Sequence, residues 1–329
     1  WLGKKKGKEA YIVPTVVGDH IEYSIGHDPK KAPTKDNDGT VDRNGTYCLA
    51  CGTHVSFGHV RTEAQNGNMG SNLIAVVGEG DRLRIYLPPD EIHVAASIRA
   101  TSSDAPMGDL PESALGFRVQ AYGMLRYSDL FSKRQLVALT TFSDLVGEAR
   151  ERVLRDALST GTAEGERLEE GGSGAAAYAD AVATYLGFVV SRLTDYSSSI
   201  NTWASNPQME ILRNVFARQA LPMAWDFAEG NPFADSSGSL AIMIRAVSLA
   251  VERAPARGQS VAEQADAATR DYSGVVISTD PPYYDNIGYS DLSDFFYVWL
   301  RRSLKGIHPR LLSTVLVPKE EELVANPYR

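Results

Sequence analysis

Hydrophobic residues recur at helical spacing through the middle of the chain. One stripe runs from Leu136 to Val153 and a second from Tyr178 to Leu193, with apolar positions mostly three or four residues apart. The connector between them, residues 161–174, is rich in glycine and glutamate, so we expect two helices that pack as a hairpin with an exposed loop. Such stripes are far more often buried core than cofactor contacts, and we assign them no chemistry. Further helices are predicted over residues 209–220, 239–253 and 291–304.

Short alternating runs predict antiparallel strands ahead of this helical part. Residues 11–13 and 20–24 alternate between apolar and polar side chains, and residues 28–44 are polar and rich in turn formers. The β-like pattern continues through residues 71–121. A last strand is predicted at residues 312–317.

A β-branched run followed by two prolines lies within residues 273–285. Residues 275–277 are Val-Val-Ile, a pattern typical of a strand buried on both faces of a parallel sheet. Pro281 and Pro282 cannot donate ladder hydrogen bonds, so the chain leaves the sheet just past the carboxyl end of this strand. Ligands of open α/β sheets bind at that edge.

The side chains around the two prolines suit one kind of chemistry. An exocyclic amine of a nucleobase needs acceptors for its two hydrogens and a flat surface that holds the base out of its stack. Asp280 and the Pro281 carbonyl supply acceptors, and Tyr283 supplies an aromatic face. Four such residues also occur in ordinary turns. The strand before them and the sequence after them favour the catalytic interpretation.

The motif and its continuation resemble the amino-methylating, S-adenosylmethionine-dependent DNA methyltransferases. Their catalytic motif is Asp, Asn or Ser, then Pro-Pro, then an aromatic residue, after a hydrophobic strand. The run from Ser278 to Arg302 is similar to one subgroup, the adenine-specific DNA methylases that contain a zinc ribbon, and residues 221–238 match the same subgroup.

This resemblance implies methyl transfer from S-adenosylmethionine to the N6 amine of adenine in DNA. It also implies a role in restriction-modification or phage defence. Orienting the amine suffices for this reaction, because the amine is itself the nucleophile. The implied catalytic residues are Asp280, Pro281, Pro282 and Tyr283, with Tyr284 and Asp285 as support around the base.

Several alternatives stay open. N4-cytosine methylation uses the same geometry, although cytosine enzymes often have serine where this chain has Asp280. Related Pro-Pro-Tyr loops modify RNA or the glutamine amides of proteins. An alternative of another class is a non-catalytic nucleic-acid-binding module in which the zinc ribbon makes the contacts.

No glycine-rich turn in the chain is a convincing cofactor loop. Gly78-Glu-Gly80 follows an apolar run, but an alternating run follows it instead of a helix, which predicts a β-hairpin. Gly172-Ser-Gly174 opens a helix after an acidic loop. In the family the glycine-rich segment lies N-terminal to the zinc ribbon. We therefore expect it upstream of Trp1, and we expect this chain to be a fragment that is inactive alone.

Cys48 and Cys51 are the two cysteines of the chain, and they have a spacing typical of metal ligands. With Gly52 directly after them they resemble one knuckle of a zinc ribbon, which is half of a tetrahedral zinc site. The remaining ligands are either His54 or His59, or a second cysteine pair upstream of Trp1, which the resemblance favours. The alternative is two reduced, unligated cysteines.

Composition adds further constraints. The chain has 329 residues, of which 43% are hydrophobic and 22% charged, as in an ordinary globular protein. No apolar run approaches the roughly 18 residues of a membrane span, and no signal-peptide pattern opens the chain, which favours the cytoplasm. Since the net charge is −8, a DNA-facing surface must be a local basic patch. One candidate is the cluster Lys4, Lys5, Lys6 and Lys8, which a solvated hairpin tip explains equally well.

These observations divide the chain into four segments. The predicted fold class is α/β, a partial Rossmann-like methyltransferase sheet that carries a β-rich zinc-ribbon-like module and a helical insertion. The expected partners are DNA and the subunits of a defence system. The segments are the zinc-ribbon-like module with half a site at 1–60, a β-rich segment at 61–125, the helical insertion at 126–220, and the catalytic part of the methyltransferase domain at 221–329.

Overall fold

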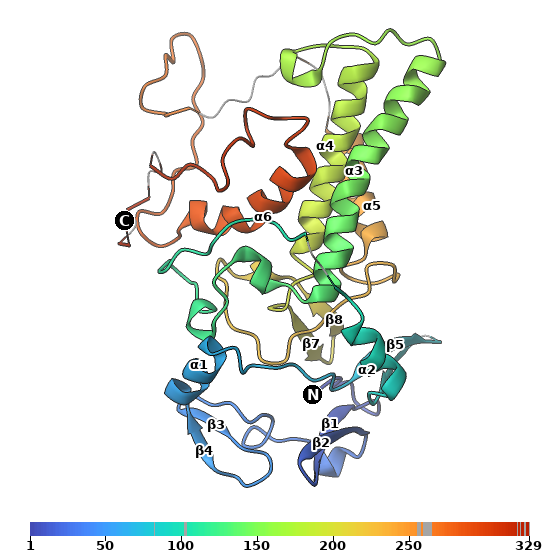
Figure 1. Ribbon diagram of the computed structural model, residues 1–329, viewed down its shortest axis with the longest axis vertical. Helices are drawn as coiled ribbons and strands as arrows, with labels where there is room; N and C mark the ends of the chain where they lie inside the picture. Colours follow the sequence, from blue (N-terminus) through green and yellow to red (C-terminus); the bar gives the residue numbers. More distant parts are fainter. Residues whose placement is uncertain are drawn as a thin grey trace.

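Two long helices, α3 (Lys133–Ser159) and α4 (Ala175–Thr194), pack side by side as the predicted hairpin (Figure 1). The computed structural model describes the whole chain except residues 82, 102, 103, 255–257, 259–264, 321, 323, 326 and 329. Helix α3 begins in a capping box, in which Ser132 accepts a hydrogen bond from the Gln135 N–H and the Gln135 side chain accepts one from the Ser132 N–H. The two predicted helices are confirmed, and their predicted apolar stripes are confirmed in part: Leu139 and Leu193 are fully buried, whereas Leu145 and Tyr178 are exposed.

A buried carboxylate fixes the connector of the hairpin to both helices. Asp180 in α4 is fully buried and accepts hydrogen bonds from Arg150 Nε at 2.6 Å and from Arg167 Nε at 2.8 Å. Burial opposes the charged form, but the two guanidinium groups outweigh it and hold the pKa of Asp180 below its usual value. Arg167 also donates to the Gly306 carbonyl, which joins the connector to the segment after α6.

Helices α5 (Leu240–Arg253) and α6 (Tyr289–Leu304) pack against α4, and α6 carries the centre of the main core. Phe295 and Trp299 are fully buried there, and the ring of Phe131 contacts both. The predicted apolar face of residues 291–304 is therefore confirmed. The helix begins earlier than predicted, after Gly288.

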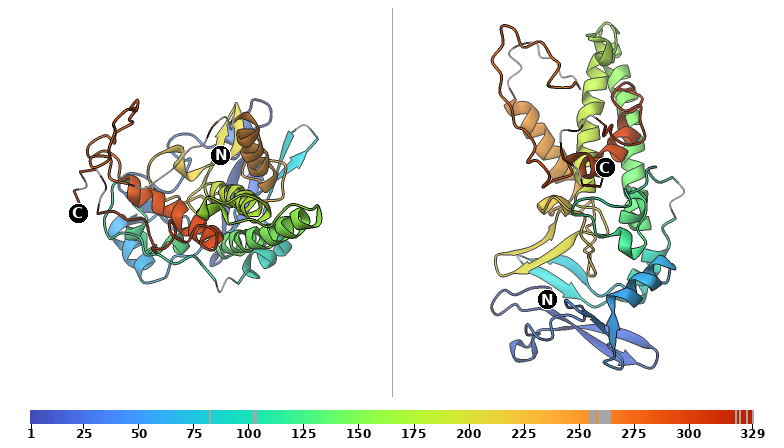
Figure 2. Two further views of the ribbon diagram at one scale, coloured as in Figure 1. Left: turned by 90° about the horizontal axis from the view of Figure 1, so that it is seen from above. Right: turned by 90° about the vertical axis from the view of Figure 1, so that its left-hand side faces the viewer.

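Small antiparallel hairpins form the other end of the molecule, around the N-terminus (Figures 1 and 2). The strands predicted at residues 11–13 and 20–24 are confirmed. The hairpin predicted at Gly78-Glu-Gly80 is confirmed as well, with these three residues in its first strand and not in its turn. The pairs are β1 (Tyr11–Val17) with β2 (His20–Gly26), β3 (Gly45–Tyr47) with β4 (His54–Ser56), β5 (Val76–Gly80) with β6 (Leu83–Leu87), and β7 (Thr202–Asn206) with β8 (Met209–Arg213).

Most of the short helices link these hairpins to one another and to the helical part, and one, η4 (Leu168–Glu170), lies in the connector between α3 and α4. The others are α1 (Phe57–Gln65), α2 (Glu91–Ile98), and the 3-10 turns η1 (Pro29–Lys31), η2 (Gln120–Tyr122), η3 (Tyr127–Leu130) and η5 (Val215–Ala217). The predicted segment boundary at residue 60 falls inside α1. No helix in the described part of the chain is long and apolar enough to cross a lipid bilayer.

The helix predicted at residues 209–220 is wrong. Its first part is strand β8, and the turn before it is fixed by Asn206, whose side-chain oxygen accepts from the N–H groups of Gln208 and Met209 at 3.1 and 2.8 Å. This local bonding closes a hairpin where the helix was expected to start. A short apolar run fits a strand as well as it fits a helix, and here the turn decides.

The strands predicted at residues 275–277 and 312–317 are also wrong, because none of these residues is in a strand. Val276 is 99% exposed, which is the opposite of the expected burial on both faces. The sheets of the described residues are all two-stranded and antiparallel, so they offer no parallel edge with which the run could pair. The Rossmann-like sheet, and with it the α/β class, stays a prediction.

Candidate functional site

The Asp-Pro-Pro-Tyr motif lies in a surface loop between α5 and α6, and this loop projects from the body of the molecule (Figures 1 and 2). Its backbone makes a tight turn, in which the Tyr284 N–H donates to the Pro282 carbonyl and the Asn286 N–H donates to the Tyr283 carbonyl. Tyr284 has a φ of 34°, an uncommon backbone conformation for a bulky residue. The loop is attached to the C-terminal stretch by a hydrogen bond from the Ala325 N–H to the Tyr284 carbonyl, at 2.9 Å.

The predicted catalytic side chains are open to solvent. Tyr283 is 68% exposed and Tyr284 is 76% exposed. Asp280 and Asp285 are exposed as well, and neither carboxylate forms a hydrogen bond or an ion pair with the described residues. The acceptors of Asp280 are therefore available to a ligand. These residues line neither the cavity at the amino end of α6 nor the cavity between Arg134 and Pro232.

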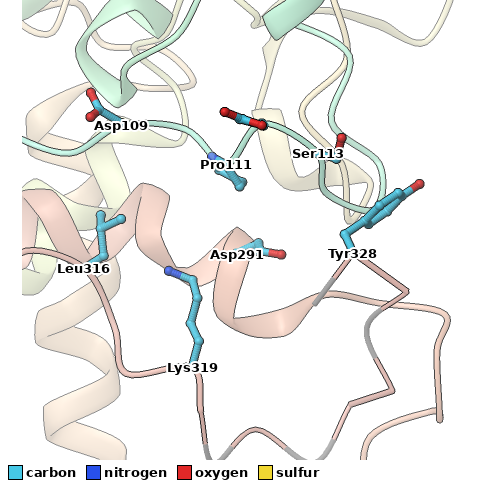
Figure 3. Close-up of a pocket in the computed structure, with 8 residues that line it drawn as sticks. Asp109, Pro111, Ser113, Asp291, Leu316, Lys319 and Tyr328 are labelled. Carbon is cyan, nitrogen blue, oxygen red and sulfur yellow. The ribbon is translucent and has the colours of Figure 1, made fainter.

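A cavity of about 420 Å³ lies close by, at the amino end of α6 (Figure 3). Residues 109–113 form one side of it, and α6 with the chain after it forms the other. Carboxylates dominate its charged lining, with Lys319 as the one cation among the lining residues. The lining consists of Asp109, Pro111, Glu112, Ser113, Asp291, Leu316, Lys319 and Tyr328.

An ion pair behind this cavity joins α6 to the C-terminal stretch. Asp294 is fully buried, pairs with Lys319 Nζ, and accepts from the Val317 N–H at 2.8 Å. Burial raises the pKa of Asp294, although Lys319 and the Val317 N–H oppose that rise. One helical turn before Asp294, the N–H and the hydroxyl of Ser290 donate to the Glu322 carboxylate. These pairs could not be predicted from the sequence, because nothing in the local pattern links residues 25 and 32 positions apart.

The loop before α5 has a structural role. Glu229 accepts hydrogen bonds from Arg134 Nε at 2.7 Å and from the Ser132 hydroxyl at 2.9 Å, which fastens this loop to the start of α3. Ser239 caps α5 by accepting from the Ile242 N–H. The run at residues 221–238 therefore includes a turn that leads into a helix.

The cysteine pair lies in the turn between β3 and β4. The Gly52 N–H donates to the Cys48 carbonyl at 2.8 Å, and Gly52 has a φ of 69°, which favours glycine. Cys51 Sγ lies 3.1 Å from the Thr53 hydroxyl. Hydrogen bonding with Thr53, and then with Cys48, holds the pKa of the Cys51 thiol below its usual value. A depressed thiol pKa favours the thiolate that binds metals.

Both thiols are exposed on this tight turn, as two zinc ligands of one knuckle would be. No group of three or more His, Cys, Asp or Glu side chains within the described residues is arranged to hold a metal ion. Neither His54 nor His59 thus completes a set with Cys48 and Cys51 in this structure. The zinc site stays a prediction that needs ligands from elsewhere.

The two glycine pairs considered for a cofactor occupy other kinds of structure. Gly78 and Gly80 pair with β6 inside a hairpin, and Gly174 is the N-cap of α4 after a loop. We assign no cofactor-binding residue to the described chain.

Neither a family model nor a curated protein nor a solved structure matches this chain.

Proposed function

We propose that the chain carries the catalytic loop of an S-adenosylmethionine-dependent DNA methyltransferase that acts on the N6 amine of adenine. The observation that carries the proposal is the state of Asp280, an exposed carboxylate without a partner among the described residues, beside two prolines and an exposed tyrosine. An acid kept for folding is normally paired, as Asp180 and Asp294 are. The acceptor sites of Asp280 are free of every described residue.

The chemistry of the loop follows from its acceptors and its ring. Asp280 and the Pro281 carbonyl would each accept one hydrogen of the amine, which directs the nitrogen lone pair away from them. Tyr283 would stack on the extruded base, a contact worth roughly 1 to 3 kcal/mol. The amine would be the nucleophile once it is oriented, so no covalent link to the protein is needed. S-adenosylmethionine would supply the methyl group and leave as the thioether as the N–C bond forms, and the amine would lose one proton to the Asp280 carboxylate or to solvent. The described residues contain no cofactor turn, so the chain's own part is to position the base.

The exposed run before the loop supports the same proposal. Residues 275–277 expose three β-branched side chains, and residues 276–281 form no main-chain hydrogen bond with any described residue. A run that is apolar on both faces is stable only where both faces are covered. We propose that this run becomes the strand that presents the loop when a parallel sheet edge is available, and that pairing with the sheet would complete a base pocket around Asp280.

The test is transfer of a labelled methyl group by the complete gene product, with DNA, RNA and protein offered side by side. Asp280→Ala should lower transfer to DNA by about 100-fold or more, the size of loss seen when one oriented polar group is removed from an active site. Asp19→Ala removes another exposed carboxylate, at the β1–β2 turn, and should change nothing.

Identical rates for Asp280→Ala and the wild type would remove the assignment. Labelling of RNA, protein or cytosine instead of adenine would move the same loop to another substrate.

A further inference from the structure

We propose that a lysine-rich hairpin tip at the N-terminal end binds the phosphodiester backbone of a nucleic acid. The lysine tip comprises Lys4, Lys5, Lys6 and Lys8. The choice of nucleic acid as the polyanion rests on the proposed function. The site itself lies in the hairpin end of the molecule, whereas the Asp280 loop lies beside the helices (Figure 1).

The backbone gathers the four lysines on one tight turn. Gly3 and Ala10 pair as an antiparallel bridge, and the Lys8 N–H donates to the Lys5 carbonyl at 2.9 Å. Gly7, with a φ of 77°, is the third residue of this turn, the position where a type II turn requires the left-handed region. The chain therefore reverses within the lysine cluster, so the ammonium groups share one small surface.

The base of the tip is held firmly. Leu2 and Ala10 are buried with Tyr86 in a small second core, and Trp203 Nε1 donates to the Leu2 carbonyl at 2.7 Å. Because the backbone at the base of the turn is already fixed by these contacts, less conformational entropy is lost when the lysines bind a ligand. A frayed terminus would lack this advantage.

Further lysines lie next to the tip. Lys4 Nζ is 5.2 Å from the centre of the Trp1 ring, and Trp1 Nε1 donates to the Pro33 carbonyl at 3.2 Å. Trp1 thus joins the tip to the segment that carries Lys30, Lys31 and Lys35.

All seven lysines are exposed, and none forms an ion pair with a described residue. Residues 1–35 contain these seven lysines and four acidic residues, whereas the whole chain has a net charge of −8. Unpaired like charges on one rigid turn repel one another, and a row of phosphates relieves that repulsion. The tip carries only lysine and glycine between residues 4 and 8, so it lacks the apolar side chains with which a membrane-binding surface inserts.

Salt dependence of binding tests this proposal directly. The probe is a fluorescent 30-base-pair DNA duplex of arbitrary sequence, titrated with the complete gene product at salt concentrations from 50 to 200 mM. Lys5→Gln/Lys6→Gln should reduce the slope of log affinity against log salt by roughly 1.8, because each phosphate contact contributes about 0.9. Affinity should then fall several-fold at 50 mM salt and less at 200 mM.

The matched control is Lys133→Gln/Arg155→Gln, which removes two exposed positive charges from α3 and gives the same net charge. Its slope should equal that of the wild type. Melting curves of both variants check that folding is intact.

Equal slopes for the tip variant and the wild type would overturn the proposal, as would binding to anionic lipid vesicles with none to nucleic acid. Single-stranded DNA and duplex RNA of the same length show which kind of nucleic acid the tip binds. Binding to either supports the proposal. The assay needs no methyl transfer, so Asp280→Ala should bind with an unchanged slope. The two proposals can therefore fail independently.

Discussion

The loop at residues 273–285 and helix α6 follow each other in the sequence, but the loop is exposed to solvent and the helix is largely buried. Val276 in the loop is 99% exposed, whereas Trp299 in the helix is fully buried. A helix satisfies its backbone hydrogen bonds within itself and needs only a surface for its apolar face. A strand needs a neighbouring strand before its burial can begin. The helix therefore forms, whereas residues 275–277 remain without regular secondary structure.

The acidic residues of the two regions also differ in burial and in pairing. Asp294 in α6 is buried and paired with Lys319, while Asp280 in the loop is exposed and has no partner among the described residues. Burying a carboxylate requires a cation or donors nearby, and α6 supplies them. A carboxylate that binds substrate instead keeps its acceptors free. Asp294 therefore stabilises the fold, whereas Asp280 is the carboxylate on which the proposed function depends.

Amide hydrogen exchange should show the largest contrast between the regions. Amides of residues 295–299 sit in the main core and should exchange more slowly than those of residues 276–280 by at least about 10³-fold. Mass spectrometry of peptides from the two segments measures this ratio. Strong protection at residues 276–280 would mean that these residues form main-chain hydrogen bonds, which would contradict the contrast between an unpaired loop and a buried helix.

Trp299→Ala should destabilise the protein by about 3 to 5 kcal/mol, because it leaves a large cavity in the core beside Phe131 and Phe295. Val276→Ala should change the free energy of unfolding by less than about 0.5 kcal/mol, since the side chain is already in water. Urea unfolding of both variants provides the measurement. A comparable loss in Val276→Ala would show that the loop is packed.

Lys319→Met should give a smaller loss, about 1 to 3 kcal/mol at neutral pH, because it leaves Asp294 buried without its cation. Burial raises the pKa of Asp294, so the folded protein holds this proton more tightly than the unfolded chain does. Because Lys319 lowers the pKa of Asp294, its removal should raise that pKa further, so the loss should be full above the pKa of Asp294 in the variant and fade as the pH falls towards the pKa in the wild type. Lys305→Met, an exposed control at the end of α6, should have little effect at any pH.

How well the sequence predicted the fold depended on the range of the forces involved. The stripes that became α3, α4 and α6 were long and periodic, and the hairpin at Gly78-Glu-Gly80 was local. The run at 209–213 was short, and the Asn206 side chain decided between strand and helix. The strand predicted at 275–277 is wrong for another reason: these residues pair with no strand of the described chain, and the β-branched pattern carries no information about whether a partner is present.

The candidate site also has parts that local sequence predicts and parts that depend on long-range contacts. Asp280, Tyr283 and the two cysteines could be picked from residue types and spacing, because their chemistry is local. The cavity beside α6, the buried pair Asp294–Lys319 and the carboxylate of Glu322 at the helix start could not, since each joins distant segments.

The amino-acid sequence by itself determined the long helices, the turns and the kind of chemistry that each short motif can offer, because these depend on neighbours a few residues away. The tertiary structure alone decided which acids are neutralised and which remain free, and it placed the lysine tip on a rigid base. Burial and charge pairing depend on contacts between residues that are far apart in the sequence, and these contacts cannot be predicted from a local pattern.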